Sequence, residues 1–341
     1  MSTAQVLFGL LTNRWSAPSL EALDKFPIPG KTVIIVGASG GLGLEAARHY
    51  VCLGASRVIL GVRSQSRGEA AKQNIISSLK PEQTETCTID VWIVDLASFE
   101  SVKAFADRAA TELPSVDIAL LNAAIDKARF GLTKDGWEET LQVNALATTL
   151  LALLFLPKMR QSSRSDWKPC LSIVASRGHQ RVPDGEPWQD APNCLEALNK
   201  EENFGGVANR YCVSKLVLIY AVREIAKLAL SPTGEPDVVV NYSCPGACKS
   251  DLARESTSAG QRLGLALIQA TICKTTEEGS RTLVVASGLG PESHGLWYHK
   301  NRIAEPGILV TNEKGQKLQA KIWNEMLEVL APHGVEVKSK R

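Results

Sequence analysis

The chain has 341 residues, of which 44% are hydrophobic and 22% are charged, and its formal net charge is +2. These values exclude a disordered or fibrous protein and indicate a soluble globular one. They also give no indication of nucleic-acid binding, because proteins that bind nucleic acids usually carry a clustered basic surface.

Strands and helices alternate along the chain from residue 31 onward. Short β-branched runs predict strands at residues 31–38, 56–63, 89–96, 116–124, 170–176 and 237–246. Helical patterns lie between them, at residues 43–54, 67–80, 99–111 and about 136–160 and around the stretch "RYCVSK" at 210–215. Such regular alternation predicts an α/β fold, with a doubly wound parallel β-sheet covered by helices on both faces.

We expect a single domain over residues 31–335, preceded by an N-terminal extension at 1–30 and followed by a basic, solvated tail at 336–341. Two segments depart from the alternation: an insertion at 177–210 that contains Pro and Trp, and a segment at 247–275 after the sixth strand. Loops this long inside a compact domain are uncommon and often form lids or binding sites. We therefore expect both to build a substrate pocket, with passive surface packing as the alternative.

Cysteine and histidine spacing gives no indication of a metal site. The eight cysteines form no C-x-x-C pair and the five histidines do not cluster, so we predict neither a metal site nor a disulfide framework. No signal peptide is visible, and the apolar run 150–156 is too short to span a bilayer, which indicates a buried helix. We expect a reduced, cytoplasmic protein with no integral membrane segment. A second apolar run, 263–272, is either core or a lid helix suited to a bulky lipophilic substrate, and as a lid it could also touch a membrane surface.

A glycine-rich turn follows the first predicted strand. The stretch "VGASGGLG" places Gly37, Gly41 and Gly43 between that strand and the next helix. Such a turn lets backbone approach a diphosphate, while the helix N-terminus supplies N–H donors and the positive end of its dipole. The turn therefore predicts a dinucleotide site, although its G-x-x-x-G-x-G spacing differs from the commoner fingerprint.

The end of the second predicted strand indicates which dinucleotide is bound. An acidic residue there would favour NAD, whereas an arginine accommodates the 2′-phosphate of NADP. The stretch "GVRSQSRG" offers Arg63 and Arg67 and no nearby acid. A guanidinium matches a phosphate bidentately. We therefore expect NADP(H), with solvated surface charges as the alternative explanation of the two arginines.

The stretch "RYCVSK" contains Tyr211 and Lys215, four residues apart. On a helix this spacing puts both side chains on one face. A phenol beside an ammonium is either a surface coincidence or a proton-transfer device, and the pair alone does not distinguish the two.

The motifs together resemble those of a known family. The glycine turn, "VDLAS", "LNAA", "QVNA", "SIVAS", "YCVSK" and "CPGA" occur in the order and approximate spacing of the short-chain dehydrogenase/reductases, from about residue 30 to 330. The chain is most similar to the retinol-dehydrogenase-like branch, and stretches such as "ESHGLWY" resemble a fungal subset associated with secondary-metabolite pathways. The resemblance implies a Rossmann-type sheet and hydride transfer with a nicotinamide cofactor.

The resemblance also assigns a catalytic tetrad. It makes Tyr211 the general acid/base, with the Lys215 ammonium and the positive charge of an oxidised nicotinamide both lowering the pKa of the phenol. Lys215 would also bind the nicotinamide ribose. Ser176 would bind and orient the substrate oxygen. Asn144 would hold a water that links Lys215 to solvent. The pair in "RYCVSK" is therefore expected to be a proton-transfer device.

Cofactor-binding positions follow from the same motifs. In addition to Arg63, Tyr211 and Lys215, the resemblance implies Gly37, Ser39, Gly41, Leu42, Gly43, Asp95, Asn122, Pro245 and Gly246. Asp95 would hold the adenine amino group, and Asn122 would support the sheet beside the cofactor. The chain departs from the family at Ala124, where glycine is usual, and at Val36, where threonine is usual.

The expected function is an NADP(H)-dependent oxidoreductase. It would reduce a ketone or aldehyde of a lipophilic small molecule, or oxidise the matching alcohol, and the fungal resemblance suggests a role in secondary-metabolite biosynthesis. The alternative is a non-redox enzyme of the same fold (a cyclase, isomerase or dehydratase) or an NADP(H)-binding module. Assembly into a homodimer stays open.

Three further residues have two interpretations each. His179 either borders the substrate site or lies on the surface. Trp188 either lines the pocket or anchors the insertion. Tyr220 is nine residues from Tyr211, on roughly the opposite face of the helix, and is expected to pack there.

Overall fold

The computed structural model describes residues 16–205, 209–249 and 273–335. One eight-stranded sheet has the order β3-β2-β1-β4-β5-β6-β7-β8 and is parallel except for β8. Its strands are β1 Thr32–Val36, β2 Arg57–Val62, β3 Thr88–Ile93, β4 Ile118–Leu121, β5 Cys170–Val174, β6 Val239–Cys244, β7 Trp297–His299 and β8 Arg302–Ala304. The six predicted strands and the parallel α/β sheet are confirmed. The two C-terminal strands were not predicted, because three residues are too few for an alternating pattern to show.

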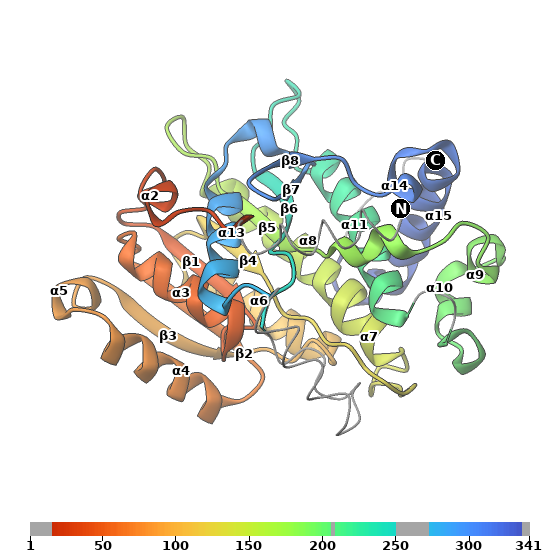
Figure 1. Ribbon diagram of the computed structural model, residues 1–341, viewed down its shortest axis with the longest axis horizontal. Coiled ribbons are helices and arrows are strands. Elements are labelled where there is room, and N and C mark those ends of the chain that lie inside the picture. The colour runs from red at the N-terminus through yellow and green to blue at the C-terminus, as the bar shows by residue number, and fades with distance from the viewer. Residues whose placement is uncertain (1–15, 206–208, 250–272, 336–341) are drawn as a thin grey trace.

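Helices cover both faces of the sheet (Figure 1). One face carries α3 Gly41–Cys52, α4 Gln65–Ser78 and α13 Thr276–Gly288. The other carries α6 Phe99–Glu112, α8 Ala147–Gln161 and α11 Arg210–Leu228, with α15 Glu313–Leu330 packed against α11. The pleat of β1 divides its side chains between two cores, since Ile34 joins the core under α8 and α11 while Ile35 joins the core under α3 and α13.

The predicted helix at about 136–160 consists of three pieces. These are α7 Glu139–Leu141, the π-helical turn η2 Gln142–Leu146 and α8. The residues 150–156 lie in α8 and are mostly buried, as predicted. By length and composition the stretch Glu139–Gln161 could cross a membrane, but 89% of its apolar window is buried inside the protein.

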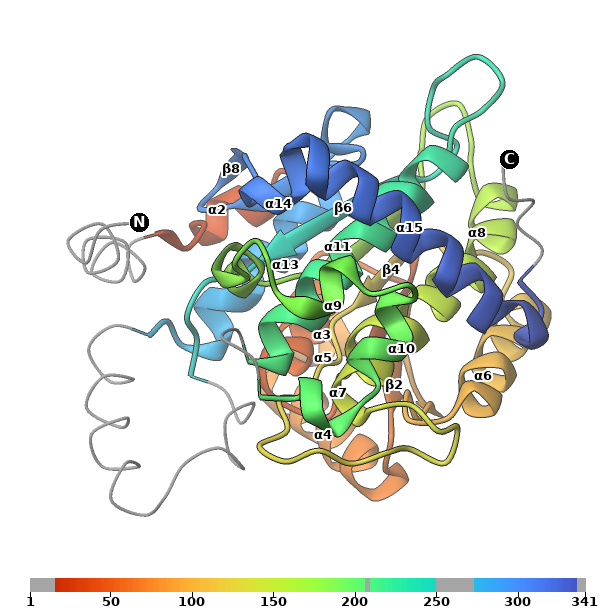
Figure 2. The same ribbon diagram turned by 90° about the vertical axis from the view of Figure 1, so that its right-hand side faces the viewer.

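The insertion 177–210 contains several short helices in its described part. They are the 3₁₀ turn η3 Arg177–Arg181, α9 Pro187–Asp190, α10 Cys194–Leu198 and the 3₁₀ turn η4 Glu201–Asn203. Figure 2 shows α9 and α10 beside α15. Trp188 is buried and donates its Nε1–H to Glu186 Oε2 at 2.6 Å, so it anchors the insertion.

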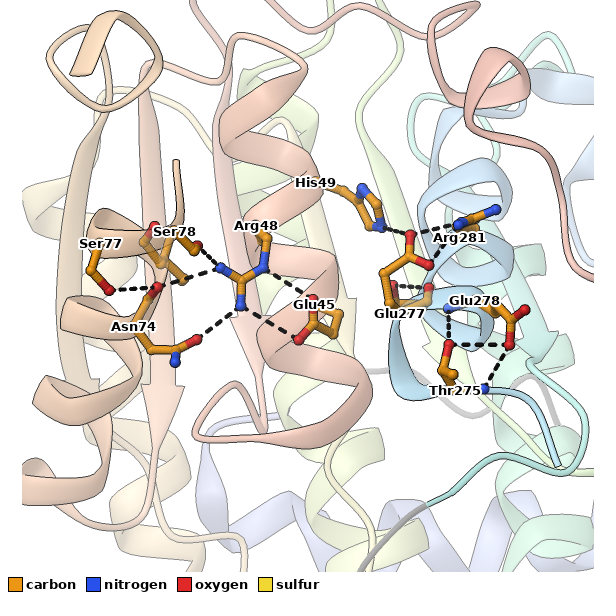
Figure 3. Close-up of polar contacts among 12 residues, drawn as sticks. Glu45, Arg48, His49, Asn74, Ser77, Ser78, Thr275, Glu277, Glu278 and Arg281 are labelled. Atoms are coloured by element: carbon orange, nitrogen blue, oxygen red, sulfur yellow. Dashed lines mark hydrogen bonds and ion pairs between the residues drawn. The ribbon is translucent and has the colours of Figure 1, made fainter. Parts of the chain in front are cut away.

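Polar contacts fix α13 against α3 (Figure 3). His49 Nε2 of α3 lies 3.2 Å from Glu277 Oε1, and Arg281 Nη2 lies 2.6 Å from the other oxygen of that carboxylate. Thr275 and Glu278 close a capping box at the N-terminus of α13. These contacts place residues 273–275 beside the chain that leaves β6, where Cys248 and Lys274 form an isolated parallel bridge.

The remaining described elements are short. They are α2 Leu20–Leu23, α5 Pro81–Thr84, η6 Pro291–Ser293, α14 Ile308–Thr311 and η7 Ala331–His333. The apolar run 263–272, which was expected to be core or lid, lies outside the described residues.

Candidate active site

Three of the four predicted catalytic side chains meet where β5 ends and α11 begins. Ser176 lies close enough to Tyr211 for its hydroxyl to influence the pKa of the phenol. The ammonium of Lys215 lies 5.9 Å from the centroid of the Tyr211 ring. The spacing in "RYCVSK" therefore gives the expected shared helix face, and that face points into the protein.

Lys215 is almost completely buried, with 1% of its surface exposed. Its Nζ donates a hydrogen bond to the carbonyl oxygen of Val174, the last residue of β5, at 2.8 Å. Burial lowers the pKa of this lysine to about 8, against an opposing effect of Cys244. The ammonium is fixed at the end of the central sheet and can lose its proton more readily than a solvated lysine.

Burial has the largest effect on the electrostatics of Tyr211. Burial raises the pKa of the phenol above its usual value of 10, and the hydrogen bond from Ser176 acts against this shift. In the protein alone, loss of solvent destabilises the phenolate more than its neighbours stabilise it. The expected lowering of this pKa by Lys215 together with an oxidised nicotinamide stays a prediction. The phenol is protonated at neutral pH.

Asn144 lies in the π-helical turn η2 and is fully buried. Its Oδ1 accepts from the N–H of Ile125 at 2.8 Å, while its Nδ2 donates to the Ile125 carbonyl at 2.8 Å and to Ser214 Oγ at 3.0 Å. The Ser214 hydroxyl in turn donates to the main-chain oxygen of Tyr211 at 2.8 Å. Asn144 thus joins the loop after β4 to the first turn of α11, and a water relay at this residue stays a prediction.

The glycine turn requires glycine at two positions. Gly37 has φ +87°, and a Cβ there would lie 2.8 Å from Ala123 Cα. A Cβ on Gly43 would lie 2.2 Å from the Gly37 carbonyl oxygen, which already accepts from Asn122 Nδ2 at 3.0 Å. These close approaches hold the end of β4 against the turn, so Asn122 supports the sheet at the expected place.

The other side of the turn is open. A Cβ on Gly40 or Gly41 would meet no atom within 4 Å, and Gly40 caps α3 without a side-chain hydrogen bond. The first N–H groups of a helix have no partners within it, so they are available to a phosphate. Ser39 lies half-buried in the turn and Leu42 in the first turn of α3. These residues fit the diphosphate of a dinucleotide.

The departure from the family at Val36 leaves the backbone of the turn intact. Val36 ends β1, and its carbonyl oxygen accepts from the N–H groups of Asn122 at 3.1 Å and Ala123 at 2.9 Å. The strand ends are therefore joined without a threonine hydroxyl. Nothing in the structure explains the alanine at Ala124.

The remaining predicted cofactor residues lie at strand ends on the same edge. Arg63 directly follows β2, is exposed, and makes no ion pair with any residue in the described ranges. Asp95 follows β3, and its Oδ1 accepts from the N–H of Ala97 at 3.0 Å. Pro245 and Gly246 follow β6, with Gly246 at φ +83°.

Two residues near the site were missed by the sequence analysis. Lys274 has 1% of its surface exposed and donates from Nζ to the Pro245 carbonyl at 3.0 Å, which holds the turn after β6. Asp126 is half-buried in the loop after β4, next to the Ile125 held by Asn144, and its charge raises the pKa of Tyr211. No motif marks either residue, because their importance comes from neighbours far away in the sequence.

The chain matches the model of the short chain dehydrogenase family over residues 31–167. A short-chain dehydrogenase/reductase of Aspergillus flavipes is 37% identical over 325 residues, 95% of this chain and 93% of that protein. A short chain dehydrogenase/reductase of Cryptosporiopsis sp. is 38% identical over 310 residues, 88% of this chain and 90% of that protein. The resemblance inferred from the motifs, including the similarity to fungal members, is confirmed.

Solved structures agree on the fold. A protein from Mycobacterium paratuberculosis superposes with a TM-score of 0.63 at 22% identity and covers 89% of this chain and 96% of its own. A Pseudomonas aeruginosa protein in an active-site complex with NADP has a TM-score of 0.58 at 18% identity, over 80% of this chain and 96% of its own. With the sequence relatives, the strand order and the motif positions in agreement, the chain belongs to the short-chain dehydrogenase/reductase family, whose members are nicotinamide-dependent oxidoreductases of CH–OH and C=O groups.

Proposed function

We propose that the protein is an NADP(H)-dependent reductase of a ketone or aldehyde on a lipophilic small molecule, with Tyr211 as the general acid. The observation that carries the proposal is the half-buried Tyr211, which lies beside the buried Lys215 and near Ser176. The same residues would oxidise the matching alcohol in the reverse direction.

The chemistry of this chain's own residues favours reduction. Burial keeps the Tyr211 phenol protonated, so it can donate to a carbonyl oxygen. The Ser176 hydroxyl, which lies near that phenol, would orient the same oxygen. Lys215, with a pKa of about 8, can return a proton to the phenol after transfer. A bound nicotinamide would supply the hydride, and the glycine turn, Asp95 and Pro245–Gly246 would hold the dinucleotide.

Aromatic side chains near the site support a lipophilic substrate. Phe130, in the loop after β4, and Phe204, in the insertion, form an edge-to-face pair with centroids 5.9 Å apart. Both are half-buried, and the guanidinium of Arg210, directly before Tyr211, lies 5.7 Å from the Phe204 ring. The insertion therefore adds apolar surface next to the catalytic helix.

The similarity to fungal relatives supports a place in secondary metabolism, and eight free cysteines support a reducing, cytoplasmic location. The assembly state stays a prediction, and light scattering after size-exclusion chromatography would show whether the protein is a homodimer.

Arg63 is exposed and has no ion-pair partner in the described part of the chain, which supports NADP(H) over NAD(H), and a binding titration tests this. Titrating NADPH and NADH against wild type, Arg63→Ala and Arg67→Ala should show NADPH affinity lowered by about tenfold to a hundredfold in Arg63→Ala, the worth of a charged hydrogen bond to phosphate. NADH affinity should not change. Arg67→Ala tests the second arginine of the same stretch, which is also exposed but lies inside α4. A similar loss of NADPH affinity there would assign the 2′-phosphate to both guanidiniums.

Equal NADPH and NADH affinities in wild type would contradict NADP preference while leaving the redox mechanism in place. Failure of both nucleotides to bind would instead favour the non-redox alternative. The substrate class is then tested by following NADPH absorbance with a panel of alkyl and aryl ketones and aldehydes.

A further inference from the structure

His179 is buried three residues after Ser176, with 1% of its surface exposed. Of the two interpretations left open by the sequence, the surface position is therefore excluded, and both ring nitrogens are hydrogen-bonded to backbone groups. Nδ1 lies 2.6 Å from the Ser176 carbonyl oxygen, and Nε2 lies 2.9 Å from the main-chain nitrogen of Gly307. The ring also meets Trp297 edge to face, with centroids 5.1 Å apart.

These two bonds determine the tautomer of His179. The N–H of Gly307 can only donate, so Nε2 must be the unprotonated acceptor. The proton of the neutral ring is then on Nδ1, where it donates to the Ser176 carbonyl. Burial also lowers the pKa of His179 to about 4, so the ring stays neutral at physiological pH.

Gly307, the residue bonded to His179 Nε2, is in turn connected to α11. Gly307 precedes α14, and the carbonyl oxygen of Leu309 in α14 accepts from the hydroxyl of Tyr220 in α11 at 2.7 Å. Tyr220 thus packs as predicted. Closer to Ser176, a Cβ on Gly178 would lie 3.1 Å from Cys212 Sγ of α11, so η3 and α11 are in close contact.

We propose that His179 is a positioning residue, which holds Ser176 against Tyr211 by joining the Ser176 carbonyl to the Gly307 amide through an Nδ1–H tautomer. Ser176 caps the turn η3, and the two bonds of His179 oppose a shift of this turn along α11. The expected fall in kcat rests on the proposed carbonyl reduction. The hydrogen bonds of His179 themselves do not depend on the reaction.

The structure provides a matched control in His294, which joins two backbone groups at the opposite end of α11. Its Nδ1 accepts from the N–H of Val240 at 3.2 Å, and its Nε2 donates to the Ala226 carbonyl at 2.9 Å. The two histidines therefore have opposite tautomers. His294 lies at the end of α11 opposite to Tyr211 and Ser176. Its substitution therefore measures the effect of losing a histidine that bonds two backbone groups, without displacing Ser176.

The kinetic test compares His179→Asn, His179→Gln and His294→Gln. Asparagine can keep the donor to the Ser176 carbonyl, whereas glutamine can keep the acceptor for Gly307. Using the best ketone of the panel, both His179 variants should lower kcat by about tenfold to a hundredfold, as expected for a displaced catalytic group. The KM for NADPH should stay within about twofold, and His294→Gln should change neither.

A second readout does not need activity. The N–H of Gly178 donates to Ser176 Oγ at 3.0 Å, so its hydrogen exchange reports where that hydroxyl lies. Exchange at Gly178 and Gly307 should be faster in His179→Asn than in wild type and unchanged in His294→Gln. Nitrogen-15 NMR of wild type should show Nδ1–H at His179 and Nε2–H at His294.

If Gly178 keeps its protection when the Gly307 bond is lost, or if kcat falls equally in His294→Gln, the positioning role is wrong. An Nε2–H tautomer at His179 would also overturn it. If wild type reduces no carbonyl compound while the exchange and tautomer results hold, the proposed reaction fails and the positioning of Ser176 stands.

Discussion

At the scale of single residues, the buried Lys215 lowers the free energy of unfolding. Lys215 must lose most of its hydration to lie beside Tyr211, and a single hydrogen bond to the Val174 carbonyl compensates only in part. Functional sites commonly keep such unfavourable groups because the chemistry needs them. The pKa of about 8 reflects this free-energy cost, since the lysine binds its proton less tightly in the folded protein than in the unfolded one.

Replacing Lys215 with methionine should therefore stabilise the protein while abolishing activity. Between pH 8 and pH 10.5 the unfolded lysine binds more protons than the folded one, so wild-type stability should rise with pH through that window. At pH 7 Lys215→Met should raise the free energy of unfolding by up to about 3 kcal/mol, less about 1 kcal/mol for the lost hydrogen bond. Urea unfolding at pH 7 and near pH 10 measures this difference. A gain that does not shrink at the higher pH would contradict the explanation.

Sequence motifs gave the identities of Tyr211, Lys215 and Ser176 but not the direction of the phenol's pKa shift. The sequence indicates which residues are neighbours, and an ammonium beside a phenol should lower its pKa. Burial acts in the opposite direction and raises the pKa of this phenol. The extent of burial depends on every element packed around α11, and no local pattern contains that information.

At the scale of elements, a buried ion pair joins α7 to the start of α11. Glu138 Oε2 and Arg210 Nε lie 3.5 Å apart, and both side chains are inaccessible to solvent. The Glu138 carboxylate also accepts from the N–H groups of Thr140 and Leu141 at 2.8 Å each, so it caps α7. Since η2 with Asn144 follows α7, and Tyr211 follows Arg210, the ion pair connects two elements of the proposed active site.

Removing one partner of this pair should be more harmful than removing both. Arg210→Met leaves the Glu138 carboxylate buried without its cation and should lower the free energy of unfolding by about 3–5 kcal/mol. Adding Glu138→Gln should recover part of that loss. Lys103→Met is the control: its pair with Asp107 is exposed, so the change should cost less than about 1 kcal/mol. Equal losses in the single and double variants of the buried pair, measured by urea unfolding, would show that the charge is not the cause.

Elements were predictable as far as β6 but not beyond it. Six strands and the helices between them follow from periodicity, whereas β7 and β8, with three residues each, and the longer helices α13 and α15 were not predicted. The π-helical turn at Asn144 was also missed, because its residues have the composition of an ordinary helix. The contacts of Asn144 with Ile125 and Ser214 at this turn come from other parts of the fold.

At the scale of the whole molecule, the C-terminal helix holds the insertion that separates two catalytic residues. The insertion begins directly after Ser176 and ends directly before Tyr211. Glu325 of α15 accepts from the N–H of Cys194 with one oxygen and from the N–H of Leu195 with the other, both at 2.9 Å. A carboxylate 130 residues away thus caps the helix α10 in the insertion.

Glu325→Gln should loosen the insertion without unfolding the sheet. Glutamine offers only one acceptor to the two N–H groups, so the local stability of α10 should fall by about 1–3 kcal/mol. Hydrogen exchange should become faster at Cys194 and Leu195 and stay unchanged in β1. Glu328→Gln, an exposed change on the same helix, should alter neither region. Unchanged exchange at Cys194 would show that the contacts within the insertion suffice to hold α10.

The sequence by itself determined the α/β alternation, the glycine turn and the family, because these depend on periodicity and on short motifs of neighbouring residues. Only the tertiary structure decided the partners of His179, Lys274 and Glu325, and the electrostatics of Tyr211. His179 meets Gly307 across 128 residues, and its two backbone bonds follow from the packing of η3 against α14. Desolvation likewise depends on all the atoms around a group. Local patterns therefore name the chemical groups of the site, while long-range packing sets their geometry and their protonation.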